Sequence, residues 1–345
     1  MTLRMPAEWE RQKAVWLAWP HNQEDWPDRF GPIPWAYAEI IRYLAQVERV
    51  RLIIKNARMQ KEAMSILERH GVDMDKIDFI TAATDRVWQR DAGPIFVYEG
   101  KKRILLDWRF NAWAKYDNWK HDNKIPAVVE KFLKLLRIQP MHKGKRVVLE
   151  GGSIDVNGKG TLLTSEECLL SKIQCRNPGF TRDDYAQVFA KYLGISNVVW
   201  LKDGIVGDDT HGHVDDLARF VNPTTVVTIV EKDKTDANYD ILRENLKRLK
   251  KARDQNGKQM TIAELPMTKP ITFEGQRLPV SYANFLIANR LVLVPTFNDI
   301  NDRVALNVLT ELFPKHDVVG IYCGDFIWGL GTIHCASQQE PASFS

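Results

Sequence analysis

The feature of this chain that most constrains its fold is a weak internal repeat of short apolar runs, each interrupted by a turn. After Asp91 and Ala92 the sequence reads Gly-Pro-Ile-Phe-Val-Tyr, then a turn of Glu-Gly-Lys-Lys, then Arg-Ile-Leu-Leu-Asp-Trp. An apolar run, a turn and a second apolar run predict a β-hairpin. The same order returns after Glu150, after Asp215 and after Asn284. We therefore predict a strand pair at each of these points.

The turn residues support the same strand pairs. The second pair turns at Asn157-Gly158, which is the strongest of these signals because both central positions of a tight hairpin need a positive φ. The third and fourth pairs turn at Asn222-Pro223 and at Asn289-Arg290. The hairpins are thus predicted from the turns as well as from the apolar runs.

Stretches with helical spacing and helix-forming composition lie between the strand pairs and ahead of the first one. We predict helices at Pro34 to Gln46, Met59 to His70, Ile125 to Leu136, Asp183 to Leu193, Asn238 to Lys251 and Arg303 to Phe313. A strand pair with its helix recurs about every 50 to 70 residues, the scale on which repeats usually indicate a propeller or an array. A unit with one apolar sheet face cannot bury that face alone, so we expect the units to pack around an axis.

A polar residue stands at the entrance of each unit. No Ser/Gly-rich or Pro-rich linker divides the chain, so we predict a single domain over residues 1–345. If its units surround an axis, the side chains at their entrances converge. These side chains are Asp91, Glu150, His213 with Asp215, Asn284 and, near the C-terminus, Cys335.

Charge and composition exclude several classes of protein. Lys and Arg number 48 against 44 Asp and Glu, which gives a formal net charge of +4. The two signs are interleaved and no basic block stands out, so nucleic acid is not an expected partner. The first residues carry charges and Pro6 where a signal peptide needs an apolar run, and no run is long enough for a membrane span. We expect a soluble, cytoplasmic protein with no membrane partner.

Cys335 is the cysteine that invites a chemical role. It follows Gly329-Leu-Gly331-Thr-Ile-His334, where the glycines let the backbone approach a ligand closely. A cysteine among apolar residues is usually inert, but a His and several carboxylates stand at equivalent points of the repeat. A thiolate nucleophile needs a base or a cation of that kind nearby. The other cysteines, Cys168, Cys175 and Cys323, form no CxxC pair and are interpreted as structural.

The segment from His211 to Asp216 allows two interpretations. His and Asp at alternate positions of a strand point to one face and could bind a metal. A second ligand cluster and an HExxH motif are lacking, so we predict no metal site. The alternative is that His213 is a general acid and base beside a carboxylate that binds the substrate.

The acidic residues indicate a cationic ligand. Arg90 and Asp91 could form an ion pair at a strand start, or Asp91 could project into a pocket while Arg90 binds elsewhere. A buried Glu150 would need a structural Arg or a cationic ligand as its partner. A planar guanidinium pairs bidentately with carboxylates, which would orient it toward a thiolate. The predicted chemistry is attack on a guanidinium carbon.

At these residues the sequence resembles the agmatine deiminase and bacterial peptidylarginine deiminase family, which belongs to the guanidino-group modifying superfamily. Matching segments run in order along nearly the whole chain. They are Met5-Pro-Ala-Glu-Trp-Glu, Trp19-Pro20, Trp88-x-Arg-Asp-x-Gly-Pro94, Glu150-Gly-Gly, Gly212-His-Val-Asp215, Ser281-Tyr-Ala-Asn-Phe285, Ile333-His-Cys335 and Gln338-Gln-Glu-Pro341. The resemblance implies the pentein fold, a five-fold pseudosymmetric α/β propeller of ββαβ-type units, which agrees with the repeat.

The resemblance also implies roles for the residues at the unit entrances. It makes Cys335 the nucleophile, His213 the general acid and then base, and Asp91 and Asp215 the carboxylates that bind the guanidinium. Glu150 would be a further carboxylate of the pocket. Asn284 matches a pocket position, and Trp88 is expected to line the pocket, as Trp19 and Trp113 could. No metal or organic cofactor is implied, and a homodimer is an expectation of the family.

Two positions depart from the family pattern. The segment before Cys335 reads Gly-Leu-Gly where three glycines are usual, and His211 stands where agmatine deiminases commonly carry Asp or another small polar residue. If His211 faced the distal end of the substrate, the case for a free amine there would weaken. Agmatine is nevertheless the leading substrate.

Other readings of the same residues stay open. Peptidyl-arginine is the second substrate candidate, and free arginine comes after it. An amidinotransferase on the same fold would use the same Cys, His and Asp set with an amine in place of water. A protein that only binds guanidines or polyamines would need the carboxylates without the Cys and the His.

Overall fold

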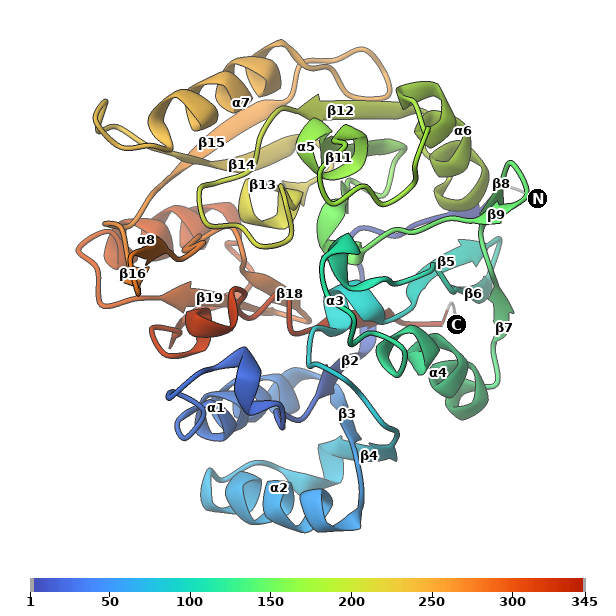
Figure 1. Cartoon of the computed structure of the whole chain (residues 1–345), viewed down its shortest axis with the longest axis vertical. Helices are drawn as coiled ribbons and strands as arrows, with labels where there is room; N and C mark the ends of the chain where they lie inside the picture. The colour runs from blue at the N-terminus through green and yellow to red at the C-terminus, as the bar shows by residue number, and fades with distance from the viewer. Residues whose placement is uncertain (1–2, 344–345) are drawn as a thin grey trace.

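The structure, a computed structural model, describes residues 3–343. Within this range, five sheets of three or four strands share one plan and surround a common centre like the blades of a propeller (Figure 1). In each of them an antiparallel strand pair is followed, through helical segments, by a strand that runs parallel to the second strand of the pair. The predicted α/β class and the repeat of strand pairs are confirmed.

The predicted hairpins form the inner part of four sheets in the described chain. They are β5 (Ile95–Glu99) with β6 (Lys102–Leu106), β10 (Asp155–Val156) with β11 (Thr161–Ser165), β13 (Ala218–Asn222) with β14 (Thr225–Val230), and β18 (Leu286–Ala288) with β19 (Leu291–Thr296). The parallel strands that follow them are β7 (Leu136–Ile138), β12 (Asn197–Leu201), β15 (Thr261–Pro266) and β20 (Asp317–Tyr322). Short additions are β1 (Leu3–Arg4) on β5, and the small pairs β8 (Met141–His142) with β9 (Lys145–Arg146) and β16 (Thr272–Phe273) with β17 (Gln276–Arg277).

The remaining sheet joins the two ends of the chain. Its order is β21 (Gln338–Pro341), β2 (Gln12–Ala18), β3 (Arg49–Ile54) and β4 (Ile77–Thr81). Trp16 pairs with Gln338 across the antiparallel edge, and the indole nitrogen of Trp16 donates to Glu340 Oε2 at 3.0 Å. Strands so far apart in sequence share no turn, so no local hairpin signal predicts this pair. The pairing closes the ring.

The predicted helices are confirmed, with small differences at their ends. They are α1 (Ile33–Val47), α2 (Ala57–Arg69), α4 (Ile125–Leu133), α6 (Arg182–Leu193), α7 (Tyr239–Lys251) and α8 (Asp302–Leu312). Helix α2 begins earlier than expected because the side chain of Asn56 accepts from the backbone N–H of Met59 at 3.0 Å and caps the helix. Helix α4 ends at Leu133 because Lys134 takes a left-handed conformation, with φ of 54°. A short helix, α5 (Glu166–Leu170), was not predicted.

The core lies between the sheets and the helices outside them. In Figure 1, α2, α6 and α7 lie toward the periphery, while the starts of the strand pairs point to the centre. Strand residues such as Leu52, Val227 and Leu293 are fully buried. Within residues 3–343 no helix is both long and apolar enough to cross a membrane. The predicted domain of residues 1–345 includes residues 1, 2, 344 and 345, which lie outside the described part.

Candidate active site

The residues predicted from the sequence converge at the centre of the ring. They lie at Asp91 on α3 (Gln89–Ala92), Glu150 before the short helix η5 (Gly151–Ser153), His213 and Asp215 at η6 (Val214–Asp216), Asn284 before β18, and Cys335 before β21. Each side chain is at most 5% exposed. Because each residue stands where a strand pair begins, the arrangement of the sheets brings them together, although they are far apart in sequence.

Asp91 is held by two donors. Its Oδ1 accepts from the backbone N–H of Gly152 at 3.0 Å, and its Oδ2 accepts from the indole N–H of Trp113 at 2.9 Å. Burial, opposed by His213 and reinforced by the charge of Asp215, raises the pKa of Asp91 to about 6. Arg90 turns away and donates to the backbone carbonyl of His334 at 3.3 Å, so it does not pair with Asp91. The carboxylate of Asp91 is therefore available to a cation from the cavity.

Asp215 presents one oxygen and has the other occupied. Its Oδ2 lies 2.6 Å from His334 Nδ1 and 3.4 Å from Asn284 Nδ2. Within the described chain its Oδ1 has no hydrogen-bond partner, and it lies 4.0 Å from His213 Nδ1. Burial alone would raise the pKa of Asp215, but His334 and then His213 outweigh it and lower this pKa. The carboxylate is therefore ionised with one free oxygen.

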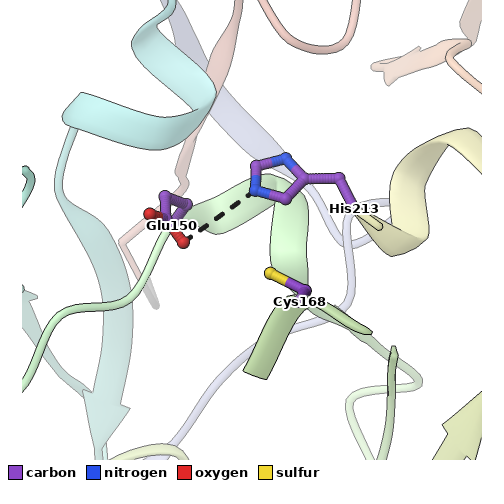
Figure 2. A group of neighbouring side chains, drawn as sticks. All are labelled: Glu150, Cys168 and His213. Atoms are coloured by element: carbon purple, nitrogen blue, oxygen red, sulfur yellow. Dashed lines mark ion pairs between the residues drawn. The ribbon is translucent and has the colours of Figure 1, made fainter. Parts of the chain in front are cut away.

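Glu150 and His213 form a second charged pair beside the carboxylates (Figure 2). Glu150 Oε2 lies 3.9 Å from His213 Nε2, and Glu150 Oε1 accepts from Arg176 Nε at 3.0 Å. Burial would raise the pKa of Glu150, but Arg176 and His213 lower it to about 2. Burial would lower the pKa of His213, but Asp91, then Cys168 and Glu150, raise it well above its ordinary value. Of the two partners that the sequence left open for Glu150, a structural Arg or a cationic ligand, the structure shows an arginine, Arg176. The imidazole of His213 carries a proton.

Cys335 lies between Asn284 and Asp215. Its Sγ is 3.0 Å from Asn284 Nδ2 and 3.7 Å from Asp215 Oδ2. Burial, with the charges of Asp215, Asp216 and Asp91, raises the pKa of the Cys335 thiol well above its ordinary value. The thiol is therefore protonated while the cavity holds no cation. Asn284 contacts the thiol from behind, so the structure places it beside the nucleophile rather than on the cavity wall.

A cavity of about 230 Å³ leads to Cys335 and Asp91. The aromatic side chains of Trp88, Trp113 and Trp328 line it. Trp88 therefore lies where the sequence placed it, and Trp113 lines the cavity as well. Trp19 packs against Tyr37 in the core instead. The remaining lining residues include Glu24, Asp25, Arg86, Tyr116, Asp209, Thr210, Phe273, Gln276, Leu278, Leu330 and Gly331.

The structure does not bring His211 to this cavity, contrary to the expectation of a substrate contact. His211 Nε2 lies 3.0 Å from the hydroxyl of Ser171, and His211 Nδ1 lies 3.6 Å from Glu167. His211 has a φ of 65°, a left-handed conformation in which Asn, Asp and His are enriched among residues with a side chain. The position therefore needs a residue that tolerates this backbone, and the His211 side chain is not among the residues that line the cavity.

The second departure, Leu330, also falls at a positive φ. Leu330 has a φ of 64° and lines the cavity just before the short approach to Cys335. Glycine adopts this conformation without a steric penalty, which gives a physical reason for glycine at the corresponding position of the family pattern. In this chain the leucine side chain contributes an apolar part of the wall.

Sequence reasoning missed several residues of the site. Asp209 lines the cavity, accepts from the Tyr116 hydroxyl at 2.7 Å and pairs with the ammonium of Lys115. Asp25 also lines the cavity and pairs with Arg86. No repeat or strand pattern marks these loop carboxylates, so only their placement identifies them.

Cys168 was interpreted as structural, yet it lies beside the charged pair of Glu150 and His213 (Figure 2). Within residues 3–343, the possible ligand atoms of these three side chains lie within 4.8 Å of one another, as do those of Asp215, Asp216 and Cys335. Arg176 already occupies one oxygen of Glu150, and His334 one oxygen of Asp215. Cations at these carboxylates oppose the binding of a metal ion in either group.

Known proteins resemble this chain over almost its full length. The sequence model of the Porphyromonas-type peptidyl-arginine deiminase family matches residues 4–341. An agmatine deiminase of Ectopseudomonas mendocina is 34% identical, with 98% of this chain and 95% of that protein covered.

Solved structures agree with the sequence comparison. The agmatine deiminase of Enterococcus faecalis superposes with a TM-score of 0.90 at 31% identity, covering 99% of this chain and 97% of that one. A cysteine-to-serine variant of the C. jejuni agmatine deiminase, with substrate bound, gives a TM-score of 0.88 at 29% identity, covering 99% and 97% of the two chains. The pentein fold implied by the sequence is therefore confirmed. With the family model matched along nearly all of its length, the chain belongs to the Porphyromonas-type peptidyl-arginine deiminase family.

Proposed function

We propose that this protein is an agmatine deiminase, a hydrolase that converts agmatine and water to N-carbamoylputrescine and ammonia. The observation that carries the proposal is one cavity whose lining residues include a thiol, Cys335, and the carboxylates of Asp91 and Asp209. Relatives and solved structures that carry the name agmatine deiminase cover nearly the whole chain.

The carboxylates of Asp91 and Asp215 would hold the guanidinium. Both carry an oxygen close to Gly152, since a Cβ built on this glycine would lie 2.9 Å from Asp91 Oδ1 and 3.2 Å from Asp215 Oδ1. A planar cation can donate to two such oxygens at once, which fixes the orientation of its carbon. This geometry supports a substrate with a guanidinium at the buried end.

Binding of the cation would also activate the thiol. The pKa of Cys335 is raised by burial and by the charges of Asp215, Asp216 and Asp91. A guanidinium between these carboxylates and the sulfur offsets their charge, so the thiol releases its proton to solvent when substrate binds. The enzyme therefore generates its nucleophile where the substrate already sits.

Two half-reactions follow, with His213 moving the protons. The Cys335 thiolate bonds to the guanidinium carbon, and the His213 imidazolium protonates the departing amino nitrogen. Ammonia departs, and the carbon remains bound to Cys335 as a thiouronium. Neutral His213 then takes a proton from water, whose oxygen bonds to the same carbon. Collapse of this tetrahedral adduct breaks the carbon–sulfur bond, returns the thiolate and leaves a urea. The second proton of the water is released, and the ammonia formed in the first half-reaction takes up a proton to become ammonium. Glu150, held by Arg176, keeps His213 charged for the first step.

The carboxylate of Asp209 on the cavity wall supports a substrate that carries an amine in addition to its guanidinium. Asp209 already binds an alkylammonium, that of Lys115, whose side chain is 41% exposed and so can move into solvent. The terminal ammonium of agmatine has the same chemistry as this lysine. The α-carboxylate of arginine would instead approach Asp209 with a like charge. Arg86 does not offset this repulsion, because it pairs with Asp25 and hydrogen bonds to Asn118.

The test of the substrate is a direct comparison of ammonia release from agmatine, arginine and a blocked peptidyl-arginine. We expect kcat/KM for agmatine to exceed that for either of the others by about 100-fold or more, because of charge repulsion at Asp209. Replacement Asp209→Asn should raise KM for agmatine by about 10- to 100-fold, the effect of losing a hydrogen bond to a charged group.

The matched control is Asp117→Asn, an exposed carboxylate on the same loop as Lys115. It should leave KM unchanged. Preferred turnover of the blocked peptidyl-arginine would assign the site to peptide modification, and product formation that requires an added amine would make it an amidinotransferase. Tight guanidine binding without turnover of any substrate would reduce the protein to a binder.

The space beside Gly152 gives a further prediction. A Cβ at this position would lie 2.6 Å from His213 Nδ1 and 2.9 Å from Asp91 Oδ1, so Gly152→Ala must displace both groups. A displacement of about 1 Å of groups that act on the substrate lowers kcat/KM by about 100-fold. Gly31→Ala is the control, because nothing lies within 4 Å of a Cβ there. Unchanged kinetics for Gly152→Ala would mean that His213 and Asp91 need no fixed position.

A further inference from the structure

Behind the site, a buried chain of charges runs from Asp215 to the N-terminal segment. His334 Nδ1 lies 2.6 Å from Asp215 Oδ2, and His334 Nε2 lies 2.9 Å from Glu8 Oε2. His334 is 1% exposed and Glu8 is 7% exposed. Glu8 belongs to the segment Met5-Pro-Ala-Glu-Trp-Glu, and His334 directly precedes the nucleophile. The mechanism proposed above uses neither residue.

The hydrogen-bond geometry defines the protonation of His334. An ionised carboxylate only accepts hydrogen bonds, so an imidazole between two of them must donate from both ring nitrogens. His334 is therefore an imidazolium. Burial would raise the pKa of Glu8, but Arg219 and then His334 hold it well below its usual range, so Glu8 is ionised. The three side chains of Asp215, His334 and Glu8 thus form a row of carboxylate, imidazolium and carboxylate.

Glu8 is fixed in turn by the body of the fold. Its Oε2 accepts from Arg219 Nη2 at 2.6 Å, and its Oε1 accepts from the backbone N–H of Ile287 at 2.7 Å. Arg219 also pairs with Asp155 and is fully buried. A residue near the N-terminus is thus tied to the strand pairs that begin at Ala218 and Leu286. The imidazolium of His334 has a rigid support on the side away from Asp215.

As a consequence, the two carboxylate oxygens of Asp215 have different surroundings. Oδ2 faces His334, while Oδ1 has no partner in the described chain and lies near Gly152. Rotation of the carboxylate would break the 2.6 Å contact to a cation inside the protein, where charge-assisted hydrogen bonds are strong. We propose that Glu8 and His334 are positioning residues that hold Asp215 ionised and turned so that Oδ1 meets the guanidinium. This inference rests on the proposed function, because Asp215 binds the guanidinium there.

The two amide replacements of His334 separate the contacts of its two nitrogens. The amide nitrogen of His334→Asn can take the place of Nδ1 and keep a donor on Asp215, while that of His334→Gln can take the place of Nε2 and keep the donor on Glu8. Both variants lose the positive charge. We expect KM to rise about 10- to 100-fold in His334→Gln, with a smaller change in kcat, and His334→Asn to recover most of this loss.

The pH dependence of kcat/KM gives a readout that a purely structural role would not move. The charged and titratable groups around Asp215 and His334 are Glu8, Arg90, Asp91, His213, Asp216, Arg219 and Cys335. Asp215 must be deprotonated to bind a cation, and loss of the adjacent imidazolium raises its pKa. The acid limb of kcat/KM should therefore move to higher pH in both His334 variants.

Glu8→Asp keeps the negative charge that buried Arg219 requires but moves the carboxylate away from His334. This variant tests the same inference if the His334 variants do not fold. It should raise KM and shift the acid limb in the same direction. Wild-type KM and an unmoved acid limb in folded variants would overturn the inference, as would equal losses in His334→Asn and His334→Gln with no pH shift. These outcomes differ from failure of the proposed function, in which the wild-type protein itself turns over no guanidine.

Discussion

We expect replacement of Cys335 by alanine to abolish turnover of agmatine while binding of agmatine stays measurable. The thiol supplies the bond to the guanidinium carbon, and Cys335 is the cysteine on the cavity wall of the described chain. We expect kcat to fall by at least about four orders of magnitude, as when a covalent nucleophile is removed. The carboxylates of Asp91 and Asp215 remain, so calorimetry should still detect the cation. Release of ammonia and heat of binding are measured on the same preparation.

Cys323→Ala is the matched control. Cys323 is buried and hydrogen bonded through its backbone to Thr296, and it does not line the cavity. Its loss should affect stability slightly and turnover little. Substantial ammonia release by Cys335→Ala would remove this thiol from the mechanism and leave water as the direct nucleophile.

We expect replacement of His213 by asparagine to lower kcat for agmatine by about 10²- to 10⁴-fold, the range for loss of a general acid and base. The same group serves both half-reactions, so neither ammonia departure nor attack by water keeps its proton carrier. The carboxylates still bind the guanidinium, and the change in KM should be smaller than the change in kcat. Steady-state kinetics and intact-protein mass spectrometry of the mixture with agmatine measure both halves.

His211→Asn tests the specificity of this effect with the same substitution two residues away. His211 contacts Ser171 and Glu167 outside the cavity, and asparagine tolerates its left-handed backbone. Its kinetics should match those of the wild-type protein. Equal losses in both variants would point to a general disturbance of this loop, and the role given to His213 would then fall.

Local patterns in the sequence determined the strand pairs, the helices and the principal site residues. A hairpin such as β5 with β6 is encoded by adjacent apolar runs and a turn, so its partners are fixed by residues a few positions apart. Since the polar residues at the pair entrances share one position in the repeat, a ring of such pairs was enough to predict that Asp91, Glu150, His213 and Cys335 meet.

The tertiary structure decided what depends on contacts between distant segments. The pair of β2 with β21, the support of Asp215 by His334 and Glu8, and the ammonium-binding carboxylate Asp209 all join segments with no local signal in common. His211 is a further case. The sequence singled it out as a departure from the family pattern, but the direction of its side chain depends on its positive φ, which only the structure shows. Short-range periodicity specifies elements and their order, whereas the partners of a loop side chain are set by how the sheets pack.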